Sequence, residues 1–160
     1  MAGTGPRALR AAGLISFALA GALLGRIPLS GHLDRMTDAQ RALVRGAVAV
    51  YKEVRPDLRH ATAFWPLGLP GWTARWLALG LRAPGVTYLT VWRRDAGAAD
   101  HHELPVTHLA GRDVRVDILH PHVPAGATAT WDPSRSVLGV SLPRAPSAML
   151  VRLRGTRRRP

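Results

Sequence analysis

The sequence lacks cysteine altogether and contains a single lysine, Lys52, among its 160 residues. Without cysteine the chain forms neither a disulfide framework nor a thiolate metal site, so its stability must come from packing, hydrogen bonds or a partner. Acidic residues are scarce as well, because 10 Asp and Glu against 22 Lys and Arg leave a formal net charge of +12. A surplus of this size attracts nucleic acid, anionic membrane or an acidic protein surface.

Motifs of several large function classes are also missing. The chain has no Gly-x-Ser-x-Gly segment to present a nucleophilic serine, and it has neither of the common glycine-rich phosphate-binding loops. The arginines are scattered along the chain and cluster only in the tail that holds Arg152, Arg154, Arg157, Arg158 and Arg159. We interpret this tail as a solvated, frayed terminus and expect no specific nucleic-acid partner.

The N-terminal apolar run is too short to cross a membrane. It covers residues 11–25 after Arg7 and Arg10, whereas a bilayer requires about 20 apolar residues. We therefore expect a cytoplasmic protein with no membrane partner. Residues 20–22 (Ala-Gly-Ala) resemble a signal-peptide cleavage site, so secretion with residues 1–22 as the signal is the alternative.

The first third of the chain has the pattern of two helices with a short strand between them. Apolar residues among alanines predict a buried helix over residues 7–24, and the run at 27–29 fits a buried strand. Thr37, with Gln40 three residues later, forms a capping-box signature. The helical spacing that follows predicts a helix over residues 38–55, which Pro56 should end.

After Leu58 the sequence changes to short β-like runs broken by Pro and Gly. Regular spacing of this kind predicts an antiparallel sandwich. The clearest pair is residues 76–82 and 87–93, joined by a turn in which Pro84 and Gly85 suit the central positions. The fold class is therefore α+β, divided into residues 1–59 and 60–160. The other expected strands are residues 114–119, 127–131, 137–142 and 149–153.

Several segments in this order resemble the C-terminal portion of the melibiase-type alpha-galactosidases, a family of glycoside hydrolases. The resemblance runs from residue 11 to the end of the chain and is strongest between residues 25 and 94. It implies that residues 1–59 are a helix-strand-helix remnant of a (β/α)8 barrel, and that residues 60–160 are the C-terminal antiparallel β-sandwich. The segments that carry it are Gly25–Leu33, Val50–Arg55, Phe64–Trp72, Leu79–Arg82 and Thr87–Arg94.

The family that this chain resembles removes terminal alpha-linked galactose with retention, through two carboxylates. In retaining glycosidases these carboxyl groups lie about 5 Å apart, and in barrel enzymes they come from several different strands. The resemblance places those strands before Met1, and the family's Lys-spacer-Asp nucleophile motif has no counterpart because Lys52 lies within a predicted helix. We therefore expect no catalytic residue here, and only Ser30, Gly31 and His32, with Asp34 beside them, at the rim of a complete active site.

Other candidate chemistry is weaker. The carboxylate pairs Asp34/Asp38 and Asp113/Asp117 are expected to be solvated or paired with arginine rather than to act as acid and base. The histidines have no carboxylate or cysteine at a firm ligand spacing, so neither a metal nor any other cofactor is expected. The histidines considered for such a site are His101, His102, His108, His120 and His122.

The tryptophans leave two interpretations open. They can stack on sugar rings, as in an autonomous β-sandwich module that binds carbohydrate or protein, but we favour a role in the core or at a domain interface. Without a barrel, the segment at residues 64–72 should become an exposed apolar patch. The expected partners are accordingly a galactoside or other glycan, the missing barrel, or a second copy of the chain. The five tryptophans are Trp65, Trp72, Trp76, Trp92 and Trp131.

Overall fold

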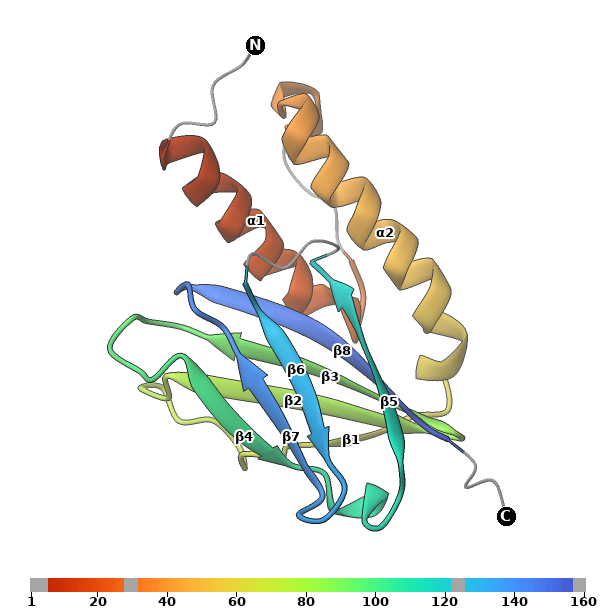
Figure 1. The fold of residues 1–160 in the computed structure, drawn as a ribbon. Helices are drawn as coiled ribbons and strands as arrows, with labels where there is room; N and C mark the ends of the chain where they lie inside the picture. The colour runs from red at the N-terminus through yellow and green to blue at the C-terminus, as the bar shows by residue number, and fades with distance from the viewer. Residues whose placement is uncertain (1–5, 28–31, 122–125, 157–160) are drawn as a thin grey trace.

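The fold is taken from a computed structural model that describes residues 6–27, 32–121 and 126–156. Within these ranges the chain forms two α-helices and then eight β-strands (Figure 1). The elements are α1 (Pro6–Leu23), α2 (Asp38–Leu58), β1 (Thr62–Phe64), β2 (Trp76–Ala83), β3 (Val86–Arg93), β4 (His101–Pro105), β5 (Val114–His120), β6 (Thr128–Asp132), β7 (Val137–Ser141) and β8 (Ser147–Gly155), with short 3-10 helices η1 (Leu33–Arg35) and η2 (Thr107–Leu109).

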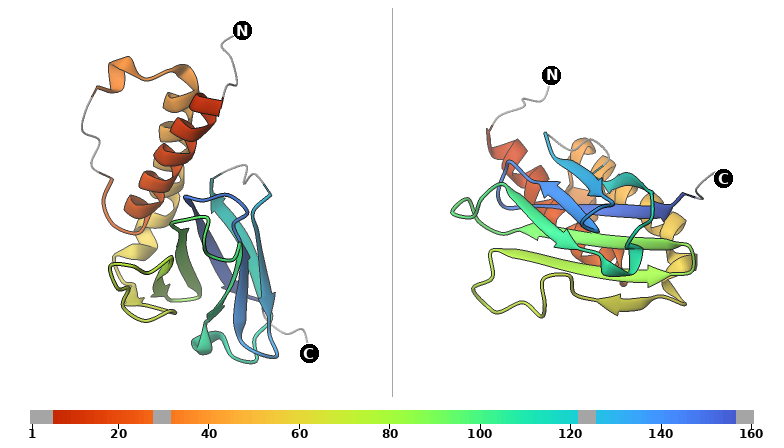
Figure 2. Two further views of the ribbon diagram at one scale, coloured as in Figure 1. Left: turned by 90° about the vertical axis from the view of Figure 1, so that its left-hand side faces the viewer. Right: turned by 60° about the horizontal axis from the view of Figure 1, so that its bottom comes forward.

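The strands form two sheets in which every paired neighbour is antiparallel. One has five strands in the order β1-β2-β3-β8-β5, and the other has three in the order β4-β7-β6. The smaller sheet covers one face of the larger, and the two helices cover the opposite face (Figures 1 and 2). The expected α+β class with an antiparallel sandwich is thus confirmed, whereas the origin of the helices in a barrel stays an inference.

Period-two alternation along β3 and β8 builds two cores from one sheet. Leu89, Val91, Met149 and Val151 point between the sheets and pack with the smaller sheet. The intervening residues, such as Tyr88 and Leu150, point toward the helices. Because both faces are covered, β3 reads as an almost continuous buried run rather than as an alternating one.

The helix predictions are confirmed, with one correction at the end of α2. The Thr37 hydroxyl accepts from the Gln40 amide, and the Gln40 side chain accepts from the Thr37 amide, which completes the capping box. Pro56 does not end this helix but lies inside its last turn, which continues to Leu58. Proline there removes only one hydrogen bond near the helix end, while Asp57 is anchored to the sheet.

Two strands were missed by the sequence pattern, and one prediction cannot be judged. β1 has only three residues, and β4 reads His-His-Glu-Leu-Pro with Leu104 as its single buried residue, so neither shows a usable alternation. Of the strand expected at residues 27–29, Ile27 lies in no strand and residues 28 and 29 lie outside the described residues. The predicted β2–β3 hairpin is confirmed, with Gly85 at a φ of 75°.

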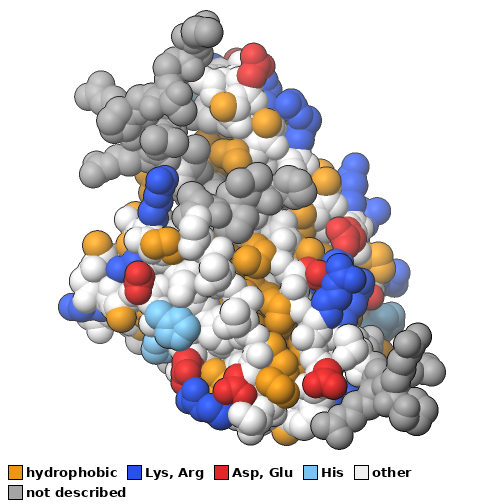
Figure 3. Space-filling view, in the orientation of Figure 1, with side chains coloured by type: hydrophobic (Ala, Val, Ile, Leu, Met, Phe, Trp, Pro, Cys, Tyr) orange, Lys and Arg blue, Asp and Glu red, His pale blue; other side chains and the backbone are white. Residues whose placement is uncertain are grey.

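The arginine tail was partly misread. Arg152 and Arg154 belong to β8, and Arg152 is joined to carboxylates on two neighbouring elements. Residues 157–159 lie outside the described residues. On the face that Figure 3 shows, basic side chains are interspersed with acidic ones rather than gathered into one patch. Neither described helix is long and apolar enough to cross a membrane.

Candidate functional site

Only some of the predicted rim residues lie in the described part of the chain. Ser30 and Gly31 lie outside the described residues, while His32 is exposed just before η1. Its Nδ1 lies 3.8 Å from Oδ1 of Asp34, and both side chains are largely in solvent. Figure 2 shows this segment at the end of the helix pair that is farthest from the sheets. Within the described part of the chain, His32 is therefore brought together only with Asp34.

The carboxylates are held by cations rather than by one another. Arg152 donates to Asp117 and Glu53, and Arg115 donates to Asp117 at 2.9 Å, so Asp117 lies in an ion-pair network as expected. Burial would raise the pKa of Asp117, but the hydrogen bonds from the two arginines outweigh it and lower that pKa. Asp38 pairs with Arg41 at 2.6 Å, also as expected. Arg152 joins β8 to α2 and β5, whereas the other two pairs lie within single elements, and these pairs present no acid-base dyad.

The histidines are dispersed over the fold. His102 stacks on Trp76 with ring centroids 5.3 Å apart, His101 lies 3.1 Å from the Ser141 hydroxyl, and His120 contacts α1. No group of three or more His, Asp or Glu residues is arranged to hold a metal ion in the described ranges. The histidines thus act locally, as separate contacts between elements.

A pocket of about 640 Å³ lies at the hairpin end of the sandwich. Its floor is the end of the inner face of the larger sheet, where Arg82, Thr87 and Leu153 face the gap between the sheets. η2 and Arg112 bound the opposite side, and Phe64 of β1 closes the sheet edge. The smaller sheet does not reach over this end, so the pocket remains open to solvent.

His108 of η2 is fixed at the centre of this pocket. Its Nε2 lies 2.8 Å from the Thr87 hydroxyl, and its ring meets the Phe64 ring edge-on at a centroid distance of 5.1 Å. Burial lowers the pKa of His108, and the positive charges of Arg82 and Arg112 lower it further. Both guanidinium groups therefore exert their field on one imidazole within the pocket.

The pocket also depends on a glycine. Gly80 pairs with Phe64 in the β1–β2 register, and a Cβ atom added at Gly80 would overlap the Phe64 ring. Along β2, the residues that face the smaller sheet are Trp76, Ala78, Gly80 and Arg82. Their side chains become smaller from Trp76 to Gly80, and the charged side chain of Arg82 follows. The Phe64 ring takes the space that Gly80 leaves and forms the apolar wall beside Arg82.

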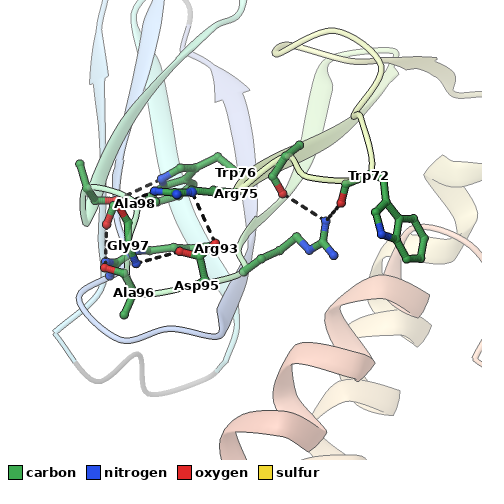
Figure 4. Close-up of polar contacts among 11 residues, drawn as sticks. Trp72, Arg75, Trp76, Arg93, Asp95, Ala96, Gly97 and Ala98 are labelled. Atoms are coloured by element: carbon green, nitrogen blue, oxygen red, sulfur yellow. Dashed lines mark hydrogen bonds and ion pairs between the residues drawn. The ribbon is translucent and has the colours of Figure 1, made fainter.

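A second polar cluster lies at the opposite end of β2 and β3 (Figure 4). Arg93 is only 5% exposed, and its guanidinium donates to the carbonyls of Leu142 at 2.7 Å and Ala98 at 2.6 Å. Arg75 donates to the Gly97 carbonyl, and the Trp76 indole donates to the Ala99 carbonyl. Carbonyls that would otherwise lack partners are thereby satisfied, so this cluster braces the loop at residues 94–100.

The segment between β1 and β2 presents an apolar surface, which we call the apron and define by its exposed residues Trp65, Leu69 and Trp72. Their exposed fractions are 44%, 79% and 91%. The Trp72 indole points away from the braced loop, while the Trp72 carbonyl accepts from Arg94 at 2.7 Å (Figure 4). The exposure expected for the segment at residues 64–72 is thus confirmed for these three residues, whereas Phe64 and Leu67 pack on the core.

Comparison with known proteins gives no assignment. No family model and no curated protein matches the chain. The function must therefore be argued from the residues themselves.

Three of the five tryptophans are buried or half-buried, and two are exposed. The pocket, in contrast, was not predicted from the sequence. Trp76 is buried and Trp92 and Trp131 are half-buried, but Trp65 and Trp72 are not core residues. Sequence reasoning singled out neither Arg82 nor Arg112, and it considered His108 only among the histidines that lack a firm ligand spacing. The available signal was an arginine at an inward-facing position of a predicted strand, which a period-two count along residues 76–82 identifies.

Proposed function

We propose that this chain is the C-terminal part of an alpha-galactosidase-like glycoside hydrolase, and that it supports a (β/α)8 barrel without supplying the catalytic carboxylates. The resemblance between residues 25 and 94 suggests the family, whose members hydrolyse terminal alpha-D-galactosides. The order of elements, two helices followed by an antiparallel sandwich, agrees with this proposal. In this role Ser30, Gly31 and His32 contribute to the rim of an active site whose floor lies in the barrel.

The exposed apron is the observation that carries the proposal. Large apolar side chains gathered on a soluble surface mark a place where another surface binds. The apron adjoins an apolar hollow of about 240 Å³ that is lined by Phe17 of α1, Leu77, Trp92 and Arg94. Arg94 also holds the backbone at Trp72, so apolar surface continues from the sandwich edge to the helix layer. A barrel that includes both helices would cover this surface.

The arrangement of the acidic groups also favours a supporting role. A retaining glycosidase needs two carboxyl groups that face a common substrate position. Glu53 and Asp117 are both engaged by Arg152, and Glu103 is engaged by Arg135 at 2.5 Å. Asp57 accepts from the Tyr88 hydroxyl. Carboxylates committed in this way stabilise the fold rather than attack a glycosidic bond.

A complementation assay tests the proposal. The chain is added to a melibiase-type alpha-galactosidase from which the corresponding C-terminal part has been deleted, and release of p-nitrophenol from the alpha-galactoside is measured. We expect the chain to restore activity and to release no p-nitrophenol on its own. The variant Trp65→Ser/Leu69→Ser/Trp72→Ser should restore far less, because it removes the apolar docking surface.

Pro133→Ser serves as the control, since Pro133 is an exposed apolar residue in the turn between β6 and β7, outside both the apron and the rim. It should complement as well as the unmodified chain. Turnover by the isolated chain would overturn the proposal, and so would complementation that is unaffected by the triple substitution. Far-UV circular dichroism of each variant shows whether the sandwich is retained.

A second candidate is an autonomous carbohydrate-binding module, which the exposed indole of Trp72 favours. Exposed aromatic rings stack on sugar faces, and Trp72 is 91% exposed. In this case the purified chain should bind galactose or a galactoside in titration calorimetry, and Trp72→Ala should abolish binding. The absence of glycan binding, together with successful complementation, would exclude the module and leave the first proposal.

A further inference from the structure

The pocket at the hairpin end has the features of a binding site for a small organic anion. Its volume of about 640 Å³ lies within the range of 300–1,000 Å³ that is typical of small-molecule sites. It lies between elements that are distant in sequence, since β1, the β2–β3 hairpin, η2 and the end of β8 all contribute. No step of the proposed supporting role uses it.

Two arginines belong to the lining of this pocket. Arg82 is exposed and follows Ala78 and Gly80 on the face of β2 that faces the smaller sheet, and Arg112 is exposed as well. Arg112 approaches from the segment between η2 and β5. No hydrogen bond or ion pair joins either guanidinium to another residue of the described ranges, although carboxylates elsewhere in the fold are paired with arginine. Two cations that share a pocket in this way provide a receptor for one anion.

The remaining lining fits an apolar body attached to the anion. The half-buried Phe64 provides the accessible apolar surface of the pocket, while Leu109 and Leu153 belong to its lining but are buried. The His108 ring is held in place by the Thr87 hydroxyl on one side and by the Phe64 ring on another. Its position is therefore set before any ligand arrives, and preorganised groups lose less entropy on binding.

We propose that this pocket binds a small organic anion, with its carboxylate or phosphate group between Arg82 and Arg112 and its apolar ring against Phe64. The shared chemistry is a planar or tetrahedral oxyanion that guanidinium groups can contact through paired N–H donors. A neutral ligand would leave both charges unneutralised, and a bare inorganic anion would leave the apolar wall unused. The pocket thus favours a ligand that carries both a negative charge and an apolar ring.

Titration calorimetry with phenyl phosphate as the probe tests this inference at low ionic strength. Arg82→Gln and Arg112→Gln should each weaken binding about tenfold or more, which corresponds to the loss of one charge-assisted hydrogen bond. Arg45→Gln is the matched control, because Arg45 is an exposed arginine on α2, away from the pocket. Benzoate distinguishes a carboxylate from a phosphate preference, while inorganic phosphate and benzyl alcohol test the anion and the ring separately.

A second readout follows the His108 imidazole by NMR during the same titration. An anion that neutralises Arg82 and Arg112 should raise the pKa of His108 in the complex, because the repulsion from both guanidinium groups is then offset. The signal of the exposed His32, at the end of the helix pair that is farthest from the sheets, serves as the reference. The inference is overturned if phenyl phosphate does not bind, if all three glutamine variants bind equally, or if His108 does not respond. Equal binding of inorganic phosphate and phenyl phosphate would also overturn it, because the apolar wall would then contribute nothing.

Discussion

The Tyr88 hydroxyl donates a hydrogen bond of 2.6 Å to Oδ2 of Asp57, which joins the last turn of α2 to the central strand β3. Tyr88 is 1% exposed, and burial together with the bond to Asp57 raises its pKa to about 12. The phenol therefore keeps its proton and remains a donor throughout the physiological range. This anchor explains why α2 continues past Pro56 to Leu58 instead of ending at the proline.

Tyr88→Phe should lower the free energy of unfolding by about 1.5–3 kcal/mol, the usual cost of losing a hydrogen bond to a charged acceptor. The aromatic ring stays in place, so packing in the core beneath the helices changes little. Tyr51→Phe on α2 is the matched control, because the half-buried Tyr51 makes no hydrogen bond through its hydroxyl to any described residue. Urea denaturation of both variants measures the difference, and equal effects would contradict the anchoring role.

Arg152 is expected to be the most important ionic residue of the fold. Its side chain is 11% exposed and joins Glu53 of α2 to Asp117 of β5, which is 17% exposed. Arg152→Met keeps the aliphatic stem but removes the partner of Glu53 and leaves Asp117 with Arg115 alone, so the free energy of unfolding should fall by about 1–3 kcal/mol. Adding Asp117→Asn should recover part of that loss in a double-mutant cycle. The exposed Arg154→Met on the same strand should have little effect, and a similar loss there would indicate a general charge effect.

The sequence predicted the elements with strong local patterns and missed those defined by tertiary contacts. The Thr37 capping box and the β2–β3 turn are encoded in a few adjacent residues, and both were predicted correctly. β1 exists because its three residues pair with the end of β2, and β4 exists because it pairs with β7. Both strands are too short for either pairing to leave an alternating hydrophobic pattern in the sequence.

The apron and the pocket also differ in whether the sequence alone predicts them. The apron was predictable because it is a contiguous segment with Trp65 and Trp72 close in sequence. The pocket was not, since Phe64, Arg82, His108 and Arg112 are brought together only by the packing of η2 over the hairpin end. The role of Arg152 was also hidden, because its partners lie 99 and 35 residues away and a run of arginines resembles a frayed tail.

Gly80 should tolerate no side chain unless Phe64 is shortened. An alanine Cβ at residue 80 would overlap the Phe64 ring, so Gly80→Ala should destabilise the fold by about 1–3 kcal/mol through overpacking. In the Phe64→Ala background the same change should cost much less, which thermal or urea denaturation can measure. Gly46→Ala provides a control in which the free energy of unfolding should rise. A methyl group at this position of α2 would meet no other atom within 4 Å, and alanine is preferred over glycine in a helix interior by about 1 kcal/mol. Additive effects of the two changes at Gly80 and Phe64 would contradict the contact.

Stability should fall as the pH drops below about 6.5, and His120 should be the main cause. The ring is 3% exposed at the end of β5, with Nε2 placed 3.1 Å from the Ser16 carbonyl and 2.9 Å from the Ser16 hydroxyl of α1. Burial lowers the pKa of His120 below the ordinary value of 6.5, although the bond to Ser16 opposes that change.

The unfolded chain therefore takes up a proton at a higher pH than the folded chain does. The contribution of His120 is complete above pH 6.5 and is lost as the pH falls toward its folded pKa. Urea denaturation between pH 8 and about pH 5 measures this contribution and avoids the titration of Asp117, whose pKa is lowered from the ordinary value of 3.8. His120→Gln should flatten the profile, leaving a residual slope from His102 and His108, whose pKa values burial also lowers. A profile that His120→Gln leaves unchanged would show that burial of the His120 ring is not what couples folding to pH.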